Sequence, residues 1–123
     1  MKGQIVSATL LPRFTSYVGP GTYATAPMDV QEFVGGLVTF WRGPLVGGAN
    51  SNPFQAYFEE SSDALAWTVM NPPGTINGVN DTDNFELEFT QRWLRVRVVL
   101  AADANGVVAL SMWLAGAIER RVA

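Results

Sequence analysis

Carboxylates, hydroxyls and arginines are the side chains that could carry chemistry here, because the sequence contains no histidine and no cysteine. The commonest general base is therefore missing. Thiol nucleophiles, Cys/His zinc sites and the Ser-His-Asp arrangement are missing as well. We predict that the protein is not an enzyme, and that it uses no cofactor and no metal.

The densest run of possible metal ligands is Asn80-Asp81-Thr82-Asp83-Asn84. Alternating carboxylates and amides of this kind can converge on a calcium ion. An EF-hand loop would continue with another oxygen ligand, a glycine and a distant glutamate, whereas Phe85 follows here. We interpret the run as a polar turn whose side chains bond to their own backbone.

A second group of carboxylates, Glu59, Glu60 and Asp63, could suggest glycoside hydrolysis. That reaction needs two carboxyl groups held about 5–9.5 Å apart across a sugar cleft. Glu59 and Glu60 are sequence neighbours, so they point to opposite faces of a strand. We interpret these residues as surface charge.

Opposite charges also recur at a spacing of two residues. Glu86 and Glu88 share one face of an expected strand, and Arg95 and Arg97 share the outer face of the next. If these strands pair, the charges match across the sheet, each pair contributing about 0.2–1 kcal/mol. They could instead form two unrelated solvent-facing rows. A third possibility is subunit contact, because seven arginines against one lysine is typical of interface use.

Four tryptophans are spread along the chain. They could form a platform on which a sugar stacks, but single tryptophans in separate strands more often fill a core or a subunit interface. They are Trp41, Trp67, Trp93 and Trp113.

The elements that must position these side chains are short β-type runs separated by Gly/Pro/Asn clusters, which is typical of an all-β fold. In most runs apolar residues alternate with polar ones, as expected when one sheet face lies in a core. The runs are 5–11, 37–42, 54–59, 65–70, 85–89, 94–100 and 107–118. The last run also contains helix-favouring residues, but the preceding Asn105-Gly106 turn favours a strand.

We predict a single all-β domain over residues 1–123, built as a β-sandwich. Residues 11–28 hold only one charge but contain Tyr17, Tyr23 and several prolines and glycines. They could form an extended arm laid on a neighbour, or a pair of short strands that cap the domain's own core.

Composition limits the partners. Hydrophobic residues make up 48% of the chain and charged residues 15%, against about 25% in an average domain. The net charge of −3 argues against phosphate-neutralising nucleic-acid binding. The longest apolar run, 107–118, is too short to span a bilayer as a helix. The start has no signal-peptide pattern, so we expect a chain made in the cytoplasm, with no membrane partner and no secretion.

The shortage of charge predicts that part of the surface is covered by a partner, and we expect a homo-oligomer, either a trimer or a dimer. Aromatic residues and arginines are the candidates for that interface. They are Tyr17, Tyr23, Trp41, Arg42, Tyr57, Trp93, Arg95, Arg97 and Trp113.

Two segments resemble the discoidin and galactose-binding-like family. Residues 57–67 (YFEESSDALAW) resemble its pattern of a strand, a Ser-x-Asp-Gly turn and a tryptophan, with Ala64 in place of the glycine. Residues 92–97 (RWLRVR) resemble its aromatic-x-Arg strand. The resemblance implies an eight-stranded jelly-roll β-sandwich, and an immunoglobulin-like sandwich is the alternative fold. As the alternative function it implies a carbohydrate-binding module, which could be tail-associated.

The segment Phe40-Trp41-Arg42-Gly43-Pro44, followed by residues 54–61 (FQAYFEES), is similar to small β-sandwich structural proteins of tailed phages. That group includes capsid decoration, or cement, proteins. The resemblance implies a structural virion protein on the capsid surface, with the major capsid protein as its partner. Its function would be to stabilise neighbouring capsid subunits.

Overall fold

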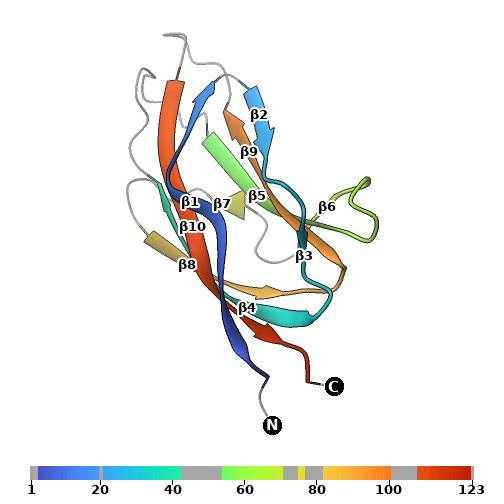
Figure 1. Ribbon diagram of the computed structural model, residues 1–123. Helices are drawn as coiled ribbons and strands as arrows, with labels where there is room; N and C mark the ends of the chain where they lie inside the picture. The colour runs from blue at the N-terminus through green and yellow to red at the C-terminus, as the bar shows by residue number, and fades with distance from the viewer. Residues whose placement is uncertain are drawn as a thin grey trace.

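Ten strands make up the secondary structure in the computed structural model, which describes residues 3–19, 21–42, 54–70, 75–76, 82–100 and 108–122 (Figure 1). Their bounds, in chain order, are β1 (Ile5–Gly19), β2 (Gly21–Ala24), β3 (Met28–Asp29), β4 (Phe33–Arg42), β5 (Phe54–Ser61), β6 (Thr68–Val69), β7 (Thr75–Ile76), β8 (Thr82–Glu88), β9 (Trp93–Leu100) and β10 (Val108–Arg120). The described residues contain no helix that is long and apolar enough to cross a membrane.

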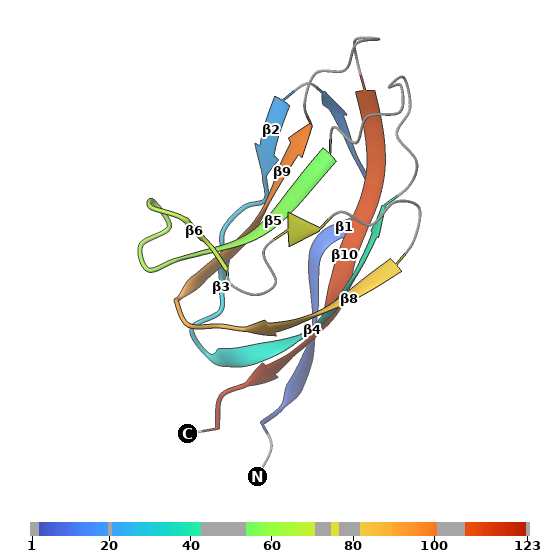
Figure 2. The same cartoon turned by 180° about the vertical axis from the view of Figure 1, so that it is seen from behind.

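Two antiparallel sheets pack face to face (Figures 1 and 2). The four-stranded sheet has the order β1-β10-β4-β8, and the six-stranded sheet has the order β2-β9-β5-β6. β3 continues β2 along one edge of β9, and β7 lies with β6 along one edge of β5. With each of these two pairs counted as one strand, the order is that of an eight-stranded jelly roll. The predicted jelly-roll β-sandwich is confirmed.

The core lies between the sheets and follows the alternation of the sequence. In β9 the side chains of Leu94, Val96, Val98 and Leu100 are buried, and those between them are partly exposed. β5 contributes Ala56 and Phe58, both fully buried. Because adjacent strand residues point to opposite faces, the remaining residues of these strands form the outer surface of the six-stranded sheet.

Two ambiguous stretches are resolved as strands. Residues 108–120 form β10, which lies between β1 and β4 in the four-stranded sheet. The strand prediction for this run is therefore confirmed. Residues 11–28 extend β1 as far as Gly19 and then form β2 and the start of β3. These strands pair with β10 and β9 of the same chain, as in the alternative of short strands rather than an extended arm.

The strand expected over residues 65–70 is wrong for most of its length. Residues 62–66 form a loop, and only Thr68 and Val69 pair with β5. The reason is local: the side chains of Ser61 and Asp63 accept hydrogen bonds from backbone N–H groups of the loop. These bonds replace those that a strand would make.

The glutamates of β8 and the arginines of β9 do not match across a sheet, because the condition for that match, pairing of the two strands, is not met. β8 pairs with β4 in the four-stranded sheet, whereas β9 pairs with β5 in the six-stranded sheet. Between them the chain crosses from one sheet to the other. The Phe89 N–H donates to the Val34 carbonyl, and the Arg92 carbonyl accepts from the Val30 N–H. Glu86 and Arg95 therefore lie on opposite sides of the sandwich.

Candidate site on the outer face of the six-stranded sheet

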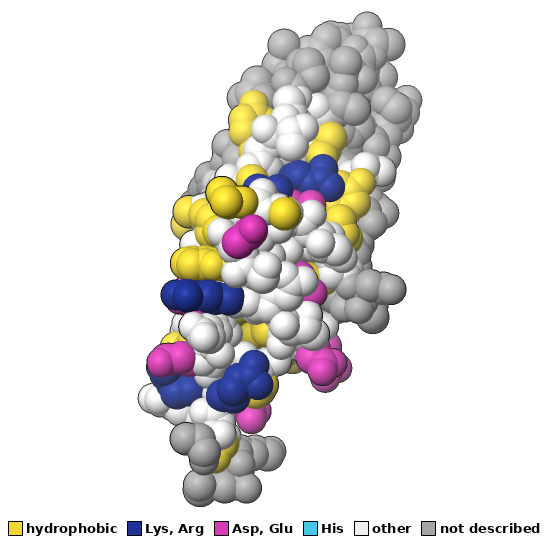
Figure 3. All heavy atoms as spheres, turned by 90° about the vertical axis from the view of Figure 1, so that its right-hand side faces the viewer, with side chains coloured by type: hydrophobic (Ala, Val, Ile, Leu, Met, Phe, Trp, Pro, Cys, Tyr) yellow, Lys and Arg dark blue, Asp and Glu magenta, His cyan; other side chains and the backbone are white. Residues whose placement is uncertain are grey.

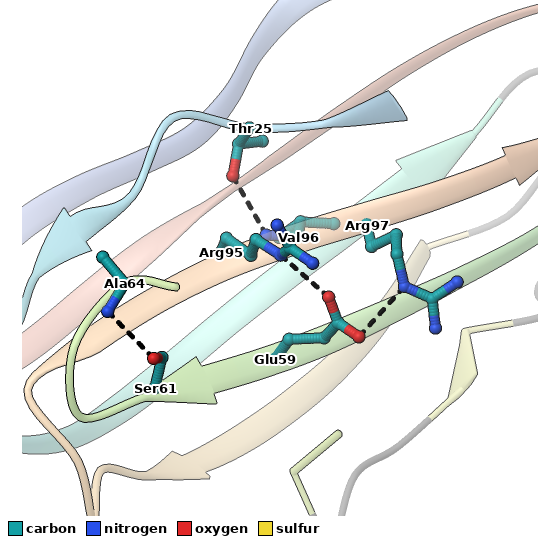
Figure 4. A network of polar contacts seen from close by, with 7 residues as sticks. All are labelled: Thr25, Glu59, Ser61, Ala64, Arg95, Val96 and Arg97. Atoms are coloured by element: carbon teal, nitrogen blue, oxygen red, sulfur yellow. Dashed lines mark hydrogen bonds and ion pairs between the residues drawn. The ribbon is translucent and has the colours of Figure 1, made fainter. Parts of the chain in front are cut away.

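A buried glutamate lies between two arginines on the outer face of the six-stranded sheet (Figure 4). Glu59 comes from β5, and only 4% of its surface is exposed. Arg95 donates from Nε to one carboxylate oxygen at 2.8 Å, and Arg97 donates from Nε to the other at 2.9 Å. The register explains the geometry, because Glu59 lies directly opposite Arg95, and the next outward residue of β9 is Arg97.

An aromatic ring covers each of these guanidinium groups. Cζ of Arg95 lies 4.3 Å from the centroid of the Trp67 ring, and Cζ of Arg97 lies 4.4 Å from that of Tyr57. Both distances are within the range of cation–π attraction. We call the five residues Tyr57, Glu59, Trp67, Arg95 and Arg97 the aromatic–arginine ladder.

The ladder is only partly closed to solvent. The side chains of Arg95 and Arg97 remain 23% and 28% exposed. In the space-filling view, arginine side chains lie at the surface beside hydrophobic side chains (Figure 3). Buried charges require partners, and Glu59 has two, so its burial is compensated. The prediction that Glu59 is simple surface charge is wrong.

The loop beside the ladder, residues 62–66, is held by its own side chains. Ser61 Oγ accepts from the Ala64 N–H (Figure 4), and Asp63 accepts from the N–H groups of Leu65 and Ala66. The hydrogen bonds from Ala66, Leu65 and Ser61 lower the pKa of Asp63 below its ordinary value. Ala64 has a φ of 61°, the left-handed conformation that glycine adopts most easily. The loop therefore has the conformation expected of the Ser-x-Asp-Gly turn, although alanine occupies the glycine position.

The outer face of the four-stranded sheet has a different composition. Two rows of small, hydroxyl or aliphatic residues cross β1, β10 and β4 there, and strand register places their members side by side. The rows are Ser7-Ala117-Leu37 and Thr9-Ala115-Thr39. We call these six residues the uncharged face. Leu37 is 57% exposed, and neighbouring Ile5 is 59% exposed.

Carboxylates lie only at the rim of the uncharged face among the described side chains of this sheet surface. Glu86 of β8 lies opposite Leu37, and Glu119 of β10 lies opposite Ile5. Beyond the second row, the register places Trp41 opposite Trp113. The centre of this surface is thus apolar or hydroxyl-bearing.

An open groove of about 1000 Å³ lies between β4 and β8 on one side and the end of β5 and β6 on the other. Its lining includes Glu60, Glu86, Glu88 and Glu119. The Glu60 carboxylate already accepts a hydrogen bond from the Thr90 hydroxyl, at 2.7 Å. Within the described part of the chain, no group of acidic residues is arranged to hold a metal ion. Asn80 and Asp81 of the calcium-like run lie outside the described residues.

The predicted interface residues divide among several places. Tyr57, Arg95 and Arg97 come together in the ladder, and Trp93 lies at the start of the same strand face, under the guanidinium of Arg92. Trp41 faces outward from the four-stranded sheet. Tyr23 packs partly against the core.

Three further candidates are placed by their backbone alone. Tyr17 pairs with Leu110, Arg42 pairs with Met112, and Trp113 pairs with Trp41. The side chains of Tyr17, Arg42 and Trp113 are outside the described part of the structure.

Two ladder residues, Glu59 and Trp67, are missing from the predicted interface set. Glu59 could have been found, because alternation puts it on the same face of β5 as Tyr57. Trp67 carries no such signal, because the loop that brings it over Arg95 interrupts the strand pattern.

The sequence matches no protein-family model and no curated protein. Several solved structures are similar to it. The PBSX exported protein XepA has a TM-score of 0.55 at 18% identity, over 96% of this chain and 39% of that chain. This chain thus spans well under half of XepA.

A structure from a study of Bacillus endospore appendages, described as a family of disulfide-linked pili, has a TM-score of 0.51 at 10% identity. That likeness covers 100% of this chain and 93% of that one. The SPBc2 prophage-derived protein YomS has a TM-score of 0.46 at 12% identity, over 94% and 96% of the two chains. At these identities the first two structures show a shared fold.

Proposed function

We propose that this protein is a structural component of a tailed-phage particle, and that it is a capsid decoration or cement protein that stabilises neighbouring capsid subunits. The observation that carries the proposal is the uncharged face. A sheet surface with a centre free of charge and with more than half of Leu37 exposed is typical of a surface covered by a partner.

The shape of this face suits contact with another protein. Small and hydroxyl side chains such as Ala115, Ala117 and Thr39 allow close approach of a second flat surface. The rim carboxylates Glu86 and Glu119 would meet basic or polar groups of that partner. The proposed partners are further copies of this chain, as a dimer or trimer, and the major capsid protein.

The structural relatives support an assembly role. The first is an exported protein, and the second comes from a study of pili. This chain has no cysteine, so its contacts with neighbours would form without disulfides. We also propose that it is not an enzyme, since its sequence lacks histidine and its buried Glu59 is bound by two arginines.

Sedimentation velocity at micromolar concentrations tests the self-association. We expect an oligomer for the unchanged protein and a monomer for Leu37→Glu, because a negative charge added directly opposite Glu86 repels it and must be desolvated in the contact. Leu65→Glu is the matched control, since Leu65 is 84% exposed but lies in the loop beside the six-stranded sheet. It should leave the oligomer intact.

A monomeric unchanged protein, or equal effects of the two substitutions, would contradict self-association through this face. The virion role is tested separately by mass spectrometry of purified particles of the phage that encodes the chain. Absence of the protein from intact particles would contradict that role.

A carbohydrate-binding module is the second candidate function. The observation in its favour is that Tyr57 and Trp67 lie on one sheet face together with two arginines. Aromatic rings and a few placed polar groups are the usual components of a site for a small ligand.

A further inference from the structure

The two arginines of the aromatic–arginine ladder hold terminal hydrogen-bond donors that the described residues leave unused. Each guanidinium contacts Glu59 through Nε. No described residue accepts a hydrogen bond from the terminal Nη atoms of either Arg95 or Arg97. Figure 4 shows the terminal nitrogens of Arg97 turned away from the carboxylate. Because each Nη carries two hydrogens, the ladder can still donate to a ligand in the plane of each guanidinium.

The local charge favours an anion. Two arginines face one glutamate, which leaves the ladder with one net positive charge in a chain of net charge −3. A further ion pair joins Arg92, just before β9, to Asp29 of β3, and it is neutral within itself. Glu59 fixes the two guanidinium groups in place, so an incoming anion does not have to order them.

The neighbouring groups narrow the class of anion. A carboxylate matches the planar fork of a guanidinium. The partly exposed rings of Tyr57 and Trp67 offer apolar surface, and exposed Gln55 lies next to Tyr57 on the same face, where its amide can bond a hydroxyl. Carboxylate, apolar C–H surface and hydroxyls occur together in a uronic acid.

We propose that the aromatic–arginine ladder binds an acidic saccharide, a sugar chain whose units carry carboxylates. The carboxylate contacts the Nη atoms of Arg97 and Arg95, and the sugar ring lies against Tyr57 or Trp67. This inference rests on the second candidate function, carbohydrate binding, and gives it a ligand class. The structural role proposed above does not depend on it.

Calorimetric titration with oligogalacturonate and with a neutral galactan oligomer of the same length tests the ligand class. We expect the acidic oligomer to bind and the neutral one to bind at least about tenfold more weakly, with affinity for the acidic one falling at high salt. If both oligomers bind equally, the proposed preference for acidic saccharides is wrong, whereas carbohydrate binding itself is supported. Binding of neither would overturn both.

Substitutions test the location. Arg97→Lys keeps a charge beside Glu59 but removes the planar fork, and Tyr57→Leu removes a ring; each should weaken acidic-oligomer binding about tenfold. Arg92→Gln is the control, since Arg92 precedes β9 and pairs with Asp29, outside the ladder. If both ladder variants bind as the unchanged protein does, or if the control loses as much affinity, the proposed site is wrong.

A readout on the unchanged protein covers the case in which a variant does not fold. The four tryptophans give separate indole N–H signals in a proton–nitrogen NMR spectrum. Titration with oligogalacturonate should shift the Trp67 signal and leave that of Trp41 in place, because Trp41 belongs to the other sheet. A shift of Trp41 without one of Trp67 would overturn the location.

Discussion

The outer faces of the two sheets carry different chemistry on the same scaffold. The six-stranded sheet presents the ladder, in which Glu59 is buried by two arginines and two rings. The four-stranded sheet presents the uncharged face, with carboxylates only at its rim among the described side chains. The difference shows that the low charge content of the chain is not spread evenly. Among the described side chains, one face gathers charges that pair with one another, and the other has no charge at its centre.

The largest difference in stability between the two faces should appear when the carboxylate of the ladder is removed. Glu59→Gln leaves two arginines without their shared counter-charge. We expect a loss of about 2 kcal/mol in unfolding free energy, between the values for a buried and an exposed ion pair that loses a partner. Urea unfolding measures it.

Glu86→Gln is the matched control on the opposite sheet. Glu86 is exposed at the rim of the uncharged face, so its loss should change the unfolding free energy by less than about 0.5 kcal/mol. Similar costs for the two substitutions would mean that the ladder contributes no more to stability than ordinary surface charge does.

Substitutions in the loop beside the ladder, residues 62–66, should have a smaller effect on stability. Ala64→Gly should raise the unfolding free energy by about 0.5 kcal/mol, because relief of the left-handed strain exceeds the added freedom of the unfolded chain. Ala66→Gly, in the same loop, only adds freedom to the unfolded chain, so it should lower the unfolding free energy by a similar amount. Thermal unfolding of both variants checks the signs, and destabilisation by Ala64→Gly would contradict the strain.

The smallest expected effect is a response of the same loop to acid. Since the folded pKa of Asp63 lies below its ordinary value of 3.8, the charged form is favoured by folding. Its contribution is complete above that ordinary value and is lost as pH falls through the lower, folded pKa. The amide NMR signals of Leu65 and Ala66, which donate to Asp63, should therefore move below about pH 4. In Asp63→Asn these two amide signals should not move with pH. A pH-dependent shift that remains in this variant would come from the titration of another group.

The fold could be predicted further than the site. Alternation of apolar residues is a direct consequence of strand geometry, so β9 and β5 were predictable with their buried faces. Residues 62–66 were not, because Ser61 and Asp63 override an apolar pattern with local hydrogen bonds. Such bonds depend on backbone angles that no periodicity reveals.

The candidate site depends on which strands become neighbours, and the alternation of apolar residues does not reveal strand pairing. Alternation predicts Arg95 and Arg97 as outward residues that can pair with carboxylates. It indicates the glutamates of the preceding strand, β8, as those carboxylates, whereas the neighbour of β9 is β5. The crossover at residues 89–92 moves the chain to the other sheet and makes β5 the neighbour. A pairing between residues 36 positions apart, Glu59 and Arg95, follows from the jelly-roll topology alone.

The topology also determines when the protein can fold during its synthesis. β10, which follows the other described strands in the chain, lies between β1 and β4, so the four-stranded sheet has a gap at its centre until residues 108–120 are available. Closing contacts over such sequence distances is slow. Until then β1 and β4 keep open edges that can pair with strands of another nascent copy. A cell that makes many copies at once would therefore expose these edges to one another until residues 108–120 of each chain have been made.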